Sequence, residues 1–185
     1  MYRRGFVRAC ALGVVGALIG RRAEASVARA VPLEALTTRS KHVIVGEPLD
    51  AYSVWERIGG RKHIVTYTRV RALELLAGAD PSADELLVRT LGGQVGELGE
   101  LVHGEAALRI GDRSVVFMMP SQDALAVTAM AQGHYPLKLD SAGIERLLRS
   151  PQANELVDQP GAAVRRLPGL RVSETRSLLQ QVVRK

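Results

Sequence analysis

The chain has 185 residues, enough for one domain with short additions, and its ordinary share of apolar and charged residues excludes a disordered or collagen-like protein. Of its 25 basic and 19 acidic residues, five arginines but only Glu24 lie within residues 1–25, so the remainder carries a net charge of +2. This argues against a nucleic-acid-binding protein, because such proteins present a concentrated basic face. The single cysteine, Cys10, also lies in this first segment, so the remainder forms no internal disulfide.

Residues 1–25 have the order of segments found in a cleavable export signal, with a basic start, an uncharged apolar run and a small-residue cleavage site. The apolar run is shorter than the roughly 20 residues that a membrane span requires. We expect cleavage after Ala25, with Ala30 as the alternative, and a periplasmic or secreted protein. The adjacent arginines Arg3 and Arg4 are typical of the twin-arginine route, with an ordinary secretory leader as the alternative. A buried helix of the domain is the other interpretation of this segment.

Residues 32–149 alternate between short apolar stretches and glycine- or proline-containing turns, which predicts a mainly-β barrel or sandwich domain. The predicted elements are a helical turn at 32–37, strands at 42–45 and 51–55 with a break at Gly46, a hairpin turn at Gly59-Gly60, strands at 64–76 and 85–90, a hairpin within 107–119, short strands at 125–131 and 134–139, and a following short helix at 141–149.

The last part of the chain is predicted to be a linker followed by a helix. Residues 150–172 contain three prolines and are expected to form the linker. Residues 173–185 are expected to form an amphipathic helix capped by Ser173. We expect its apolar stripe to pack onto the β domain, and a partner-binding helix is the alternative. The stripe consists of Leu178, Leu179, Val182 and Val183.

A series of short motifs runs in a fixed order through residues 43–139. The motifs are Val45-Gly46, Trp55, Ile64-Val65-Thr66 through Val70, Val88-Arg89-Thr90-Leu91-Gly92-Gly93, Gly111-Asp112, and Ala131-Gln132-Gly133-His134-Tyr135. This order resembles a family of uncharacterised exported bacterial proteins, and the layout is similar to the netrin-like barrel of the tissue metalloprotease inhibitors. The resemblance implies a small five- to six-stranded OB-like barrel with a short N-terminal helical turn and C-terminal helices. It does not carry the inhibitors' mechanism, because their zinc-chelating N-terminal cysteine is absent from both expected mature starts, Ser26 and Val31.

No recognisable catalytic, cofactor or metal motif occurs in the sequence. The four histidines are isolated, without the close pairing typical of metal ligands. There is no Gly-x-Ser-x-Gly nucleophile turn and no phosphate-binding loop. A hydrolytic enzyme would require His103 or His134 to meet an acid in a concave pocket.

The glycine-rich stretch from Gly92 to Gly99 follows a predicted strand, but its Gly-x-x-Gly-x-x-Gly spacing and the strand-like sequence after it do not fit a dinucleotide site. Its glycines are expected to permit positive φ angles, with a binding loop as the alternative. The nearby acids Glu97, Glu100 and Glu105 are expected to be solvated. Trp55 either covers its own hairpin or anchors an interface.

These observations favour an exported, non-enzymatic interaction module that binds a protein partner in the envelope or outside the cell. No nucleic acid, cofactor or stable membrane span is expected. The alternatives are an inhibitor or accessory of an exported metalloprotease and a hydrolytic enzyme. The expected contact residues are Trp55, Gly92, Gly93, Gly96, Glu97, Gly99 and His103.

Overall fold

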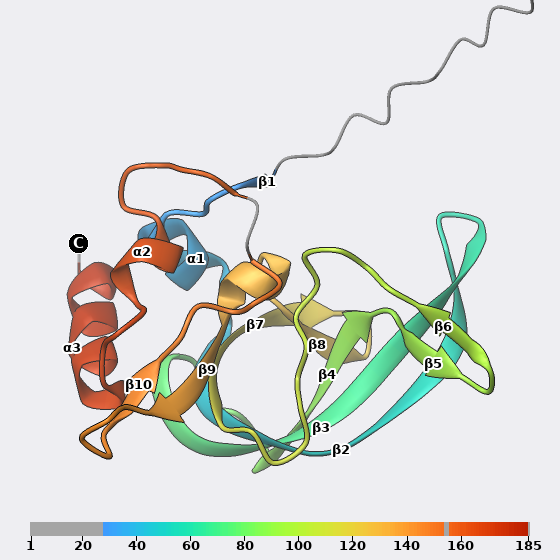
Figure 1. Ribbon diagram of the computed structural model, residues 1–185, viewed down its shortest axis with the longest axis horizontal. Coiled ribbons are helices and arrows are strands. Elements are labelled where there is room, and N and C mark those ends of the chain that lie inside the picture. The colour runs from blue at the N-terminus through green and yellow to red at the C-terminus, as the bar shows by residue number, and fades with distance from the viewer. Residues whose placement is uncertain (1–27, 154–155, 185) are drawn as a thin grey trace, which may run out of the picture.

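The computed structural model describes residues 28–153 and 156–184 (Figure 1). The predicted export signal and its cleavage site at Ala25 lie outside the described residues. The fold is mainly β, as predicted, and is built on a seven-stranded sheet with few helices. The strands are β1 (Ala28–Arg29), β2 (His42–Ile58), β3 (Arg61–Gly78), β4 (Glu85–Leu91), β5 (Gly93–Val95), β6 (Leu98–Glu100), β7 (Ser114–Ser121), β8 (Ala124–Val127), β9 (His134–Leu139), β10 (Glu145–Leu147) and β11 (Leu156–Val157), and the helices are α1 (Leu33–Arg39), η1 (Met130–Gly133), α2 (Ala163–Arg166) and α3 (Val172–Val183).

The sheet has the strand order β10-β9-β7-β2-β3-β4-β8. β2 and β3 form one long antiparallel hairpin, and its turn residues Gly59 and Gly60 both have positive φ, as the sequence predicts. β8 pairs in parallel with β4 and antiparallel with β7, which in turn pairs with β2. The pairings β2-β3-β4-β8-β7 therefore return to β2 and form a closed ring. β9 and β10 extend the sheet outward from β7.

The central strands are buried on both faces. Because successive side chains of a strand point to opposite sides, neighbouring residues of one strand enter different core clusters. On β2, Val43 and Val45 belong to a core cluster shared with the helices, whereas Ile44 belongs to a second cluster. The second cluster takes residues from all five strands of the ring and fills its interior. It contains Ile44, Val70, Val88, Ala106, Val116, Met118 and Val127.

Helix α3 packs on the first core cluster, which confirms the packing interpretation of its apolar stripe. Leu179 is fully buried, whereas Val183 at the end of the stripe remains 65% exposed. The helix is capped at Arg171 and not at Ser173, because the Glu174 carboxylate accepts a 2.7 Å hydrogen bond from the Arg171 backbone N–H.

The segment 141–149 is not the predicted helix. Its residues Glu145–Leu147 form β10, antiparallel to β9. The Asp140 carboxylate accepts backbone hydrogen bonds from Ala142 and Ile144, and Gly143 has a φ of 74°, so the chain turns back sharply. Burial of Leu147 in the core then stabilises the strand over a solvent-exposed helix.

Two further segments differ from the sequence-based expectation. Within the predicted hairpin at 107–119, only the part from Ser114 onward is a strand. Residues 150–172, expected as a linker, contain β11 and α2, and β11 pairs in parallel with β1. Ala163 and Leu167 are fully buried in this segment, so its prolines separate short packed elements.

Candidate functional site

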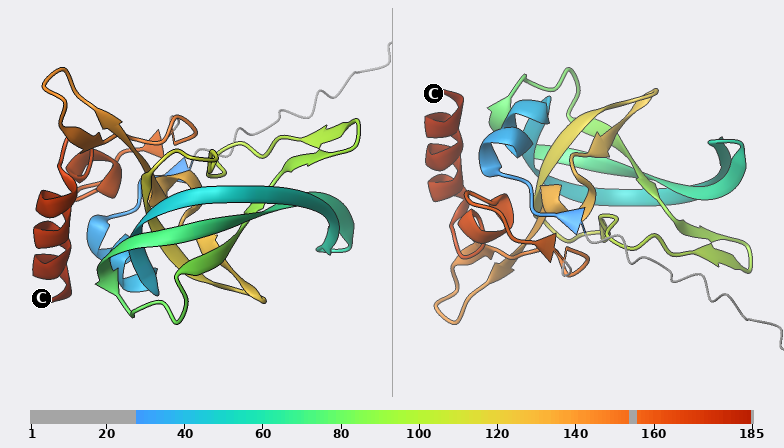
Figure 2. Two further views of the ribbon diagram at one scale, coloured as in Figure 1. Left: turned by 90° about the horizontal axis from the view of Figure 1, so that it is seen from below. Right: turned by 90° about the horizontal axis from the view of Figure 1, so that it is seen from above.

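Two hairpins project from the end of the molecule opposite α3 (Figures 1 and 2). We define the arm as the outer part of the β2–β3 hairpin, residues 50–69, together with the β5–β6 hairpin, residues 93–100. The β5–β6 hairpin packs against β2 and β3. The fold thus places the predicted contact residue Trp55 on the same projection as the glycine-rich stretch.

Two glycines of this stretch lie where the hairpins touch. A Cβ added to Gly93, whose φ is +131°, would lie 2.2 Å from the Oγ1 of Thr66 and 2.6 Å from the Oγ of Ser53. A Cβ on Gly92 would lie 2.7 Å from the carbonyl oxygen of Glu100. Gly96, in the β5–β6 turn, also has positive φ but nothing within 4 Å of such a Cβ. These positions support the structural interpretation of the glycines, because they set the geometry of the arm.

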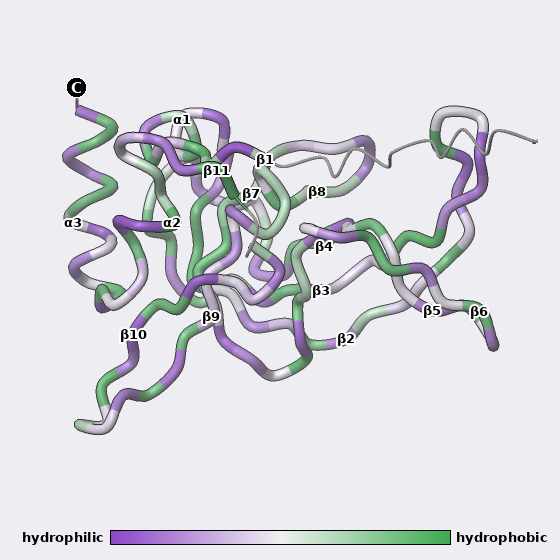
Figure 3. Tube along the Cα trace, turned by 45° about the horizontal axis from the view of Figure 1, so that its top comes forward, coloured by the Kyte–Doolittle hydropathy of each residue, from purple (hydrophilic) through white to green (hydrophobic). Residues whose placement is uncertain are grey.

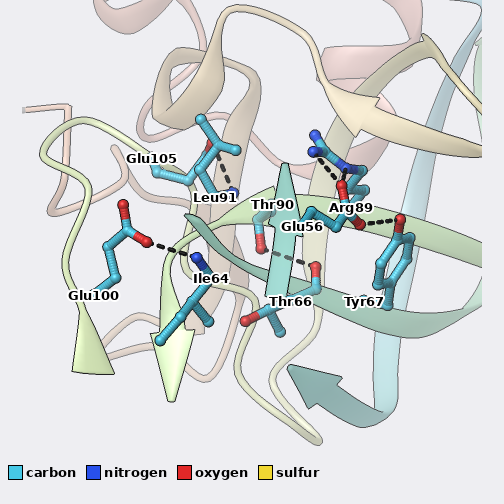
Figure 4. A network of polar contacts seen from close by, with 9 residues as sticks. All are labelled: Glu56, Ile64, Thr66, Tyr67, Arg89, Thr90, Leu91, Glu100 and Glu105. Atoms are coloured by element: carbon cyan, nitrogen blue, oxygen red, sulfur yellow. Dashed lines mark hydrogen bonds and ion pairs between the residues drawn. The ribbon is translucent and has the colours of Figure 1, made fainter. Parts of the chain in front are cut away.

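The acids near the glycine-rich stretch are only partly solvated as expected. Glu97 is exposed at the β5–β6 turn. The Glu100 carboxylate lies 2.7 Å from the Nδ1 of His63 and accepts a 2.6 Å hydrogen bond from the Ile64 backbone N–H (Figure 4). These hydrogen bonds, that of His63 above all, hold the pKa of Glu100 below its ordinary value. Glu100 therefore fastens β6 to β3.

A second polar network stiffens one face of the β2–β3 hairpin. The rings of Tyr52 and Tyr67 are stacked with centroids 5.4 Å apart. The Tyr67 hydroxyl donates a 2.5 Å hydrogen bond to Glu56, and Arg89 donates at 2.8 Å to the other carboxylate oxygen (Figure 4). The hydrogen bond from Arg89, followed by that from Tyr67, lowers the pKa of Glu56, while the carboxylate raises the pKa of Tyr67. The network links β2, β3 and β4 and fixes the base of the arm.

Large apolar side chains of the arm face solvent. Trp55 is 44% exposed and Tyr52 is 54% exposed. Strand alternation places Tyr52 and Val54 on one face of the hairpin and Trp55 on the other. Exposed aromatic side chains are typical of interaction surfaces, and Trp55 is accessible to a partner.

Positive charge gathers at the tip of the β2–β3 hairpin, where Figure 3 shows hydrophilic residues close to the turn. Arg57, Arg61 and Lys62 are exposed, and none forms an ion pair with a carboxylate of the described residues. Arg57 donates only to the carbonyl oxygen of Gly60, at 3.4 Å. The tip therefore offers three cations, of which Arg57 and its cross-strand partner Lys62 lie on the same face of the hairpin as Trp55. These cations were not among the predicted contact residues, although their position around the Gly59-Gly60 turn was a usable signal.

His103 lies apart from the rest of the predicted set. It is exposed in the segment after β6, and the carbonyl oxygen of its neighbour Gly104 accepts a hydrogen bond from Ala131 of η1. Glu105 anchors the same segment to β4, accepting hydrogen bonds from the backbone N–H groups of Leu91 and Ala106 at 3.1 and 2.9 Å (Figure 4). Burial raises the pKa of the Glu105 carboxyl. Gly99, by contrast, lies within β6 and belongs to the arm.

A hydrolytic enzyme would require His103 or His134 to meet an acid in a pocket, and His134 meets this requirement in part. His134 is buried and lines a pocket together with Asp112 and Ser114. However, Asp112 pairs with Lys138 at 2.9 Å, and neither the Ser114 Oγ nor the His134 Nδ1 has a hydrogen-bond partner among the described residues. The hydrogen bonds that join a serine, a histidine and an aspartate in a catalytic triad are thus not formed. The described residues also hold no group of three or more His, Cys, Asp or Glu suited to a metal ion.

Comparison with known proteins yields no relative. No protein-family model, curated protein or solved structure matches the chain. Within the described ranges, no helix combines the length and apolar character needed to cross a membrane.

Proposed function

We propose that the chain is an exported, non-enzymatic interaction module that binds a protein partner in the cell envelope or outside the cell through the arm. The observation that carries the proposal is the exposed Trp55 beside the cations of the hairpin tip. Tryptophan and arginine are the residues most often found as energetic anchors of interfaces. The networks of Glu56 and Glu100 support the proposal further, since a hairpin that is already ordered loses less entropy on binding.

The charges of the tip define the chemistry of the partner. Arg57, Arg61 and Lys62 have no carboxylate partner within the described part of the chain, so they favour an acidic protein surface. Such complementarity raises the association rate and selects the partner. Burial of Trp55 in an apolar pocket of that surface would supply most of the affinity. A single-stranded nucleic acid, which also combines charge with stacking groups, is the competing outcome of the test.

We propose that the ring of strands is a small OB-type barrel, as the netrin-like resemblance implies. The pairing order β2-β3-β4-β8-β7 supports this, because it closes five strands with β4 and β8 in parallel. In OB folds, the loop between the first two strands takes part in binding. Its counterpart here is the tip of the β2–β3 hairpin. The fold supports the position of the site and says nothing about the identity of the partner.

We propose cleavage of the export signal after Ala25 and not after Ala30. Residues 28–30 support this choice, because β1 pairs with β11 and Ala30 is buried. The Gln132 side chain also hydrogen-bonds the backbone of Arg29 and Val31. Cleavage after Ala30 would remove the pairing of β1 with β11, the buried Ala30 and the hydrogen bond to Arg29. The intact mass of the exported protein distinguishes the two sites.

The experiment that tests the function is photo-cross-linking in the cell. A photoreactive phenylalanine analogue replaces Trp55 in one variant and Val183 in the control, which is more exposed than Trp55 but lies on α3 at the other end of the molecule. We expect one discrete adduct from position 55, containing an acidic exported protein, and none from position 183. Equal adducts from both positions, or an adduct to nucleic acid at position 55, would overturn the proposal.

A hydrolytic function remains the second candidate because one pocket holds Ser114, His134 and Asp112. Its test is Ser114→Ala in a screen of ester and peptide substrates. Any hydrolysis that the wild type shows and Ser114→Ala abolishes would favour this function over the interaction module.

A further inference from the structure

The outer part of β2 has an open edge. β2 pairs with β7 only as far as Gly46, and beyond it a backbone hydrogen bond joins Gly111 to the Pro48 carbonyl oxygen. From Asp50 to Ile58, β3 is the only strand of the described residues that is hydrogen-bonded to β2. Figures 1 and 2 show these two strands running side by side to the end of the arm. The outer part of β2 thus has a neighbouring strand on one side alone.

The register of the hairpin shows which backbone groups of β2 point to the open side. In an antiparallel pair, residues whose N–H and C=O bond across the pair alternate with residues whose N–H and C=O point away from it. Ile64 of β3 is of the second kind, since its N–H donates to the Glu100 carboxylate and its carbonyl oxygen accepts from Gly92. Trp55 lies directly opposite Ile64, so its N–H and C=O point away from β3. By the same alternation, the outward residues of β2 are Ala51, Ser53, Trp55 and Arg57.

The outward backbone groups of these four residues have no hydrogen-bond partner within the described part of the chain. All of the four except Ser53 are exposed. Many sheets protect such an edge with a proline, a bulge or a very short strand. Here Pro48 and the register shift beside it lie nearer the core, whereas residues 50–58 pair with β3 without a shift and contain no proline. An unprotected edge of this kind is a template for a further strand.

The two faces of the hairpin define the side chains that such a strand would carry. On one face, Arg57 and its cross-strand partner Lys62 lie beside Trp55. On the other face, Tyr52 is 54% exposed and Val54 is 36% exposed. Side chains of an added strand alternate between these faces and pair with their cross-strand neighbours. Acidic side chains suit the face of the cations, and apolar side chains suit the opposite face.

We infer that the outward edge of β2, residues 51–57, takes up an extended acidic segment of the partner as an added antiparallel strand. The inference rests on the proposed function, because it states how the arm holds its partner. Main-chain hydrogen bonds to the outward residues supply affinity, and alternating acidic and apolar side chains supply specificity. A second copy of the chain fits less well. The outward residues include no carboxylate, so an antiparallel second copy brings none to Arg57 on this face.

Hydrogen exchange of the full chain tests the open edge. We expect the amides of Tyr52, Val54 and Glu56 to exchange slowly, because they bond to β3, and those of the outward residues to exchange fast. Protection of the outward amides that rises with protein concentration would mean that a second copy covers the edge, and it would overturn the inference.

The probe for the added strand is a blocked peptide of alternating glutamate and valine, as long as the segment 51–57. At ten times its Kd, the peptide should slow exchange of the outward amides by about elevenfold and leave the amides bonded to β3 as they are. In the inferred register each glutamate lies opposite an outward residue, so the glutamate N–H groups donate to β2. N-methylation of the glutamates should therefore abolish binding. N-methylation of the valines, whose N–H groups point away from β2, should leave the Kd unchanged.

Two exposed arginines provide matched variants of the chain. Arg57→Gln should raise the Kd of the peptide by about threefold, as expected for the loss of one exposed ion pair. Arg39→Gln removes the same charge on α1, outside the arm, and should leave the Kd unchanged. Equal weakening by both variants would reveal diffuse charge attraction and would overturn the inference.

Two further results would contradict strand addition. One is the absence of saturable binding at peptide concentrations up to about 1 mM. The other is equal loss of binding when the glutamates and when the valines are N-methylated, which would mean that the peptide binds through its side chains. A discrete cross-link from position 55 combined with either result would leave the proposed function in place and remove only the added strand.

Discussion

Substitution of Gly93 by alanine should loosen the arm at its base. The new Cβ would lie 2.2 Å from the Thr66 Oγ1 and 2.6 Å from the Ser53 Oγ, and the φ of +131° is one that side chains rarely adopt. Relief of the overlap requires rotation of these hydroxyls, which breaks the 2.9 Å hydrogen bond between them and the 2.7 Å bond from Thr66 to the Gly92 carbonyl oxygen. Backbone strain of about 1–3 kcal/mol and the loss of two hydrogen bonds worth about 1 kcal/mol each predict a total near 3–5 kcal/mol.

The matched control is Gly96→Ala, which has a positive φ of +61° but no atom within 4 Å of the added Cβ. It should cost only the left-handed backbone penalty of about 1–2 kcal/mol. Urea unfolding gives both free energies, and amide exchange of residues 93–100 reports whether the β5–β6 hairpin detaches before the sheet unfolds. Equal destabilisation by the two variants would refute the argument that Gly93 is required by close approach.

Two further predictions concern the core and the pocket. Leu179→Ala should lower the free energy of unfolding by about 2–5 kcal/mol, because it leaves a cavity beneath α3. The control is Val183→Ala, which should change that free energy by less than about 0.5 kcal/mol because Val183 is 65% exposed. Urea titration compares the two variants, and similar losses would contradict the packing of α3. Burial lowers the pKa of His134 from 6.5 to about 4, against the opposing charge of Asp112, so the unfolded chain binds the proton first as the pH falls. The protein should therefore lose up to about 3 kcal/mol of stability between pH 6.5 and 4. His134→Gln should abolish this loss. A His134 imidazole that titrates near pH 6.5 in the NMR spectrum would contradict the prediction.

The sequence predicted those strands and helices whose structure is specified by residues close together in the chain. The Gly59-Gly60 turn, the β-branched residues around it and the apolar stripe of 178–183 each specify their own structure, and the hairpin and α3 formed where expected. The segment 141–149 was predicted as a helix because Ile144, Leu147 and Leu148 have helical spacing. The turn at Asp140 and Gly143 and the open edge of β9 outweighed that spacing. Pairing with a distant strand cannot be read from a nine-residue window.

Some residues of the candidate site could likewise be predicted from the sequence, and others could not. Trp55 and the glycines could be singled out because residue type and spacing are visible in the sequence. The cations of the hairpin tip were visible too, but they gain meaning only through the exposure of Trp55 beside them. The pocket was beyond prediction, because Arg109, His134 and Arg149 meet only through the pairing of β7 with β9 and the return of the chain after β10. Its unpaired buried atoms are a property of the folded chain alone.

The most direct measurement of the central claim is the Kd of the partner recovered by cross-linking, determined for the wild type, Trp55→Ala, the pair Arg57→Gln with Arg61→Gln, and the control Leu139→Ala. Leu139 is 69% exposed and lies on β9, outside the arm. We predict that Trp55→Ala raises the Kd by about 30-fold or more, as expected for an anchor worth about 2 kcal/mol, and that the arginine pair slows association and weakens its dependence on salt. Leu139→Ala should bind as the wild type does. An unchanged Kd for Trp55→Ala, or equal losses for Trp55→Ala and Leu139→Ala, would contradict the assignment of the arm as the binding surface.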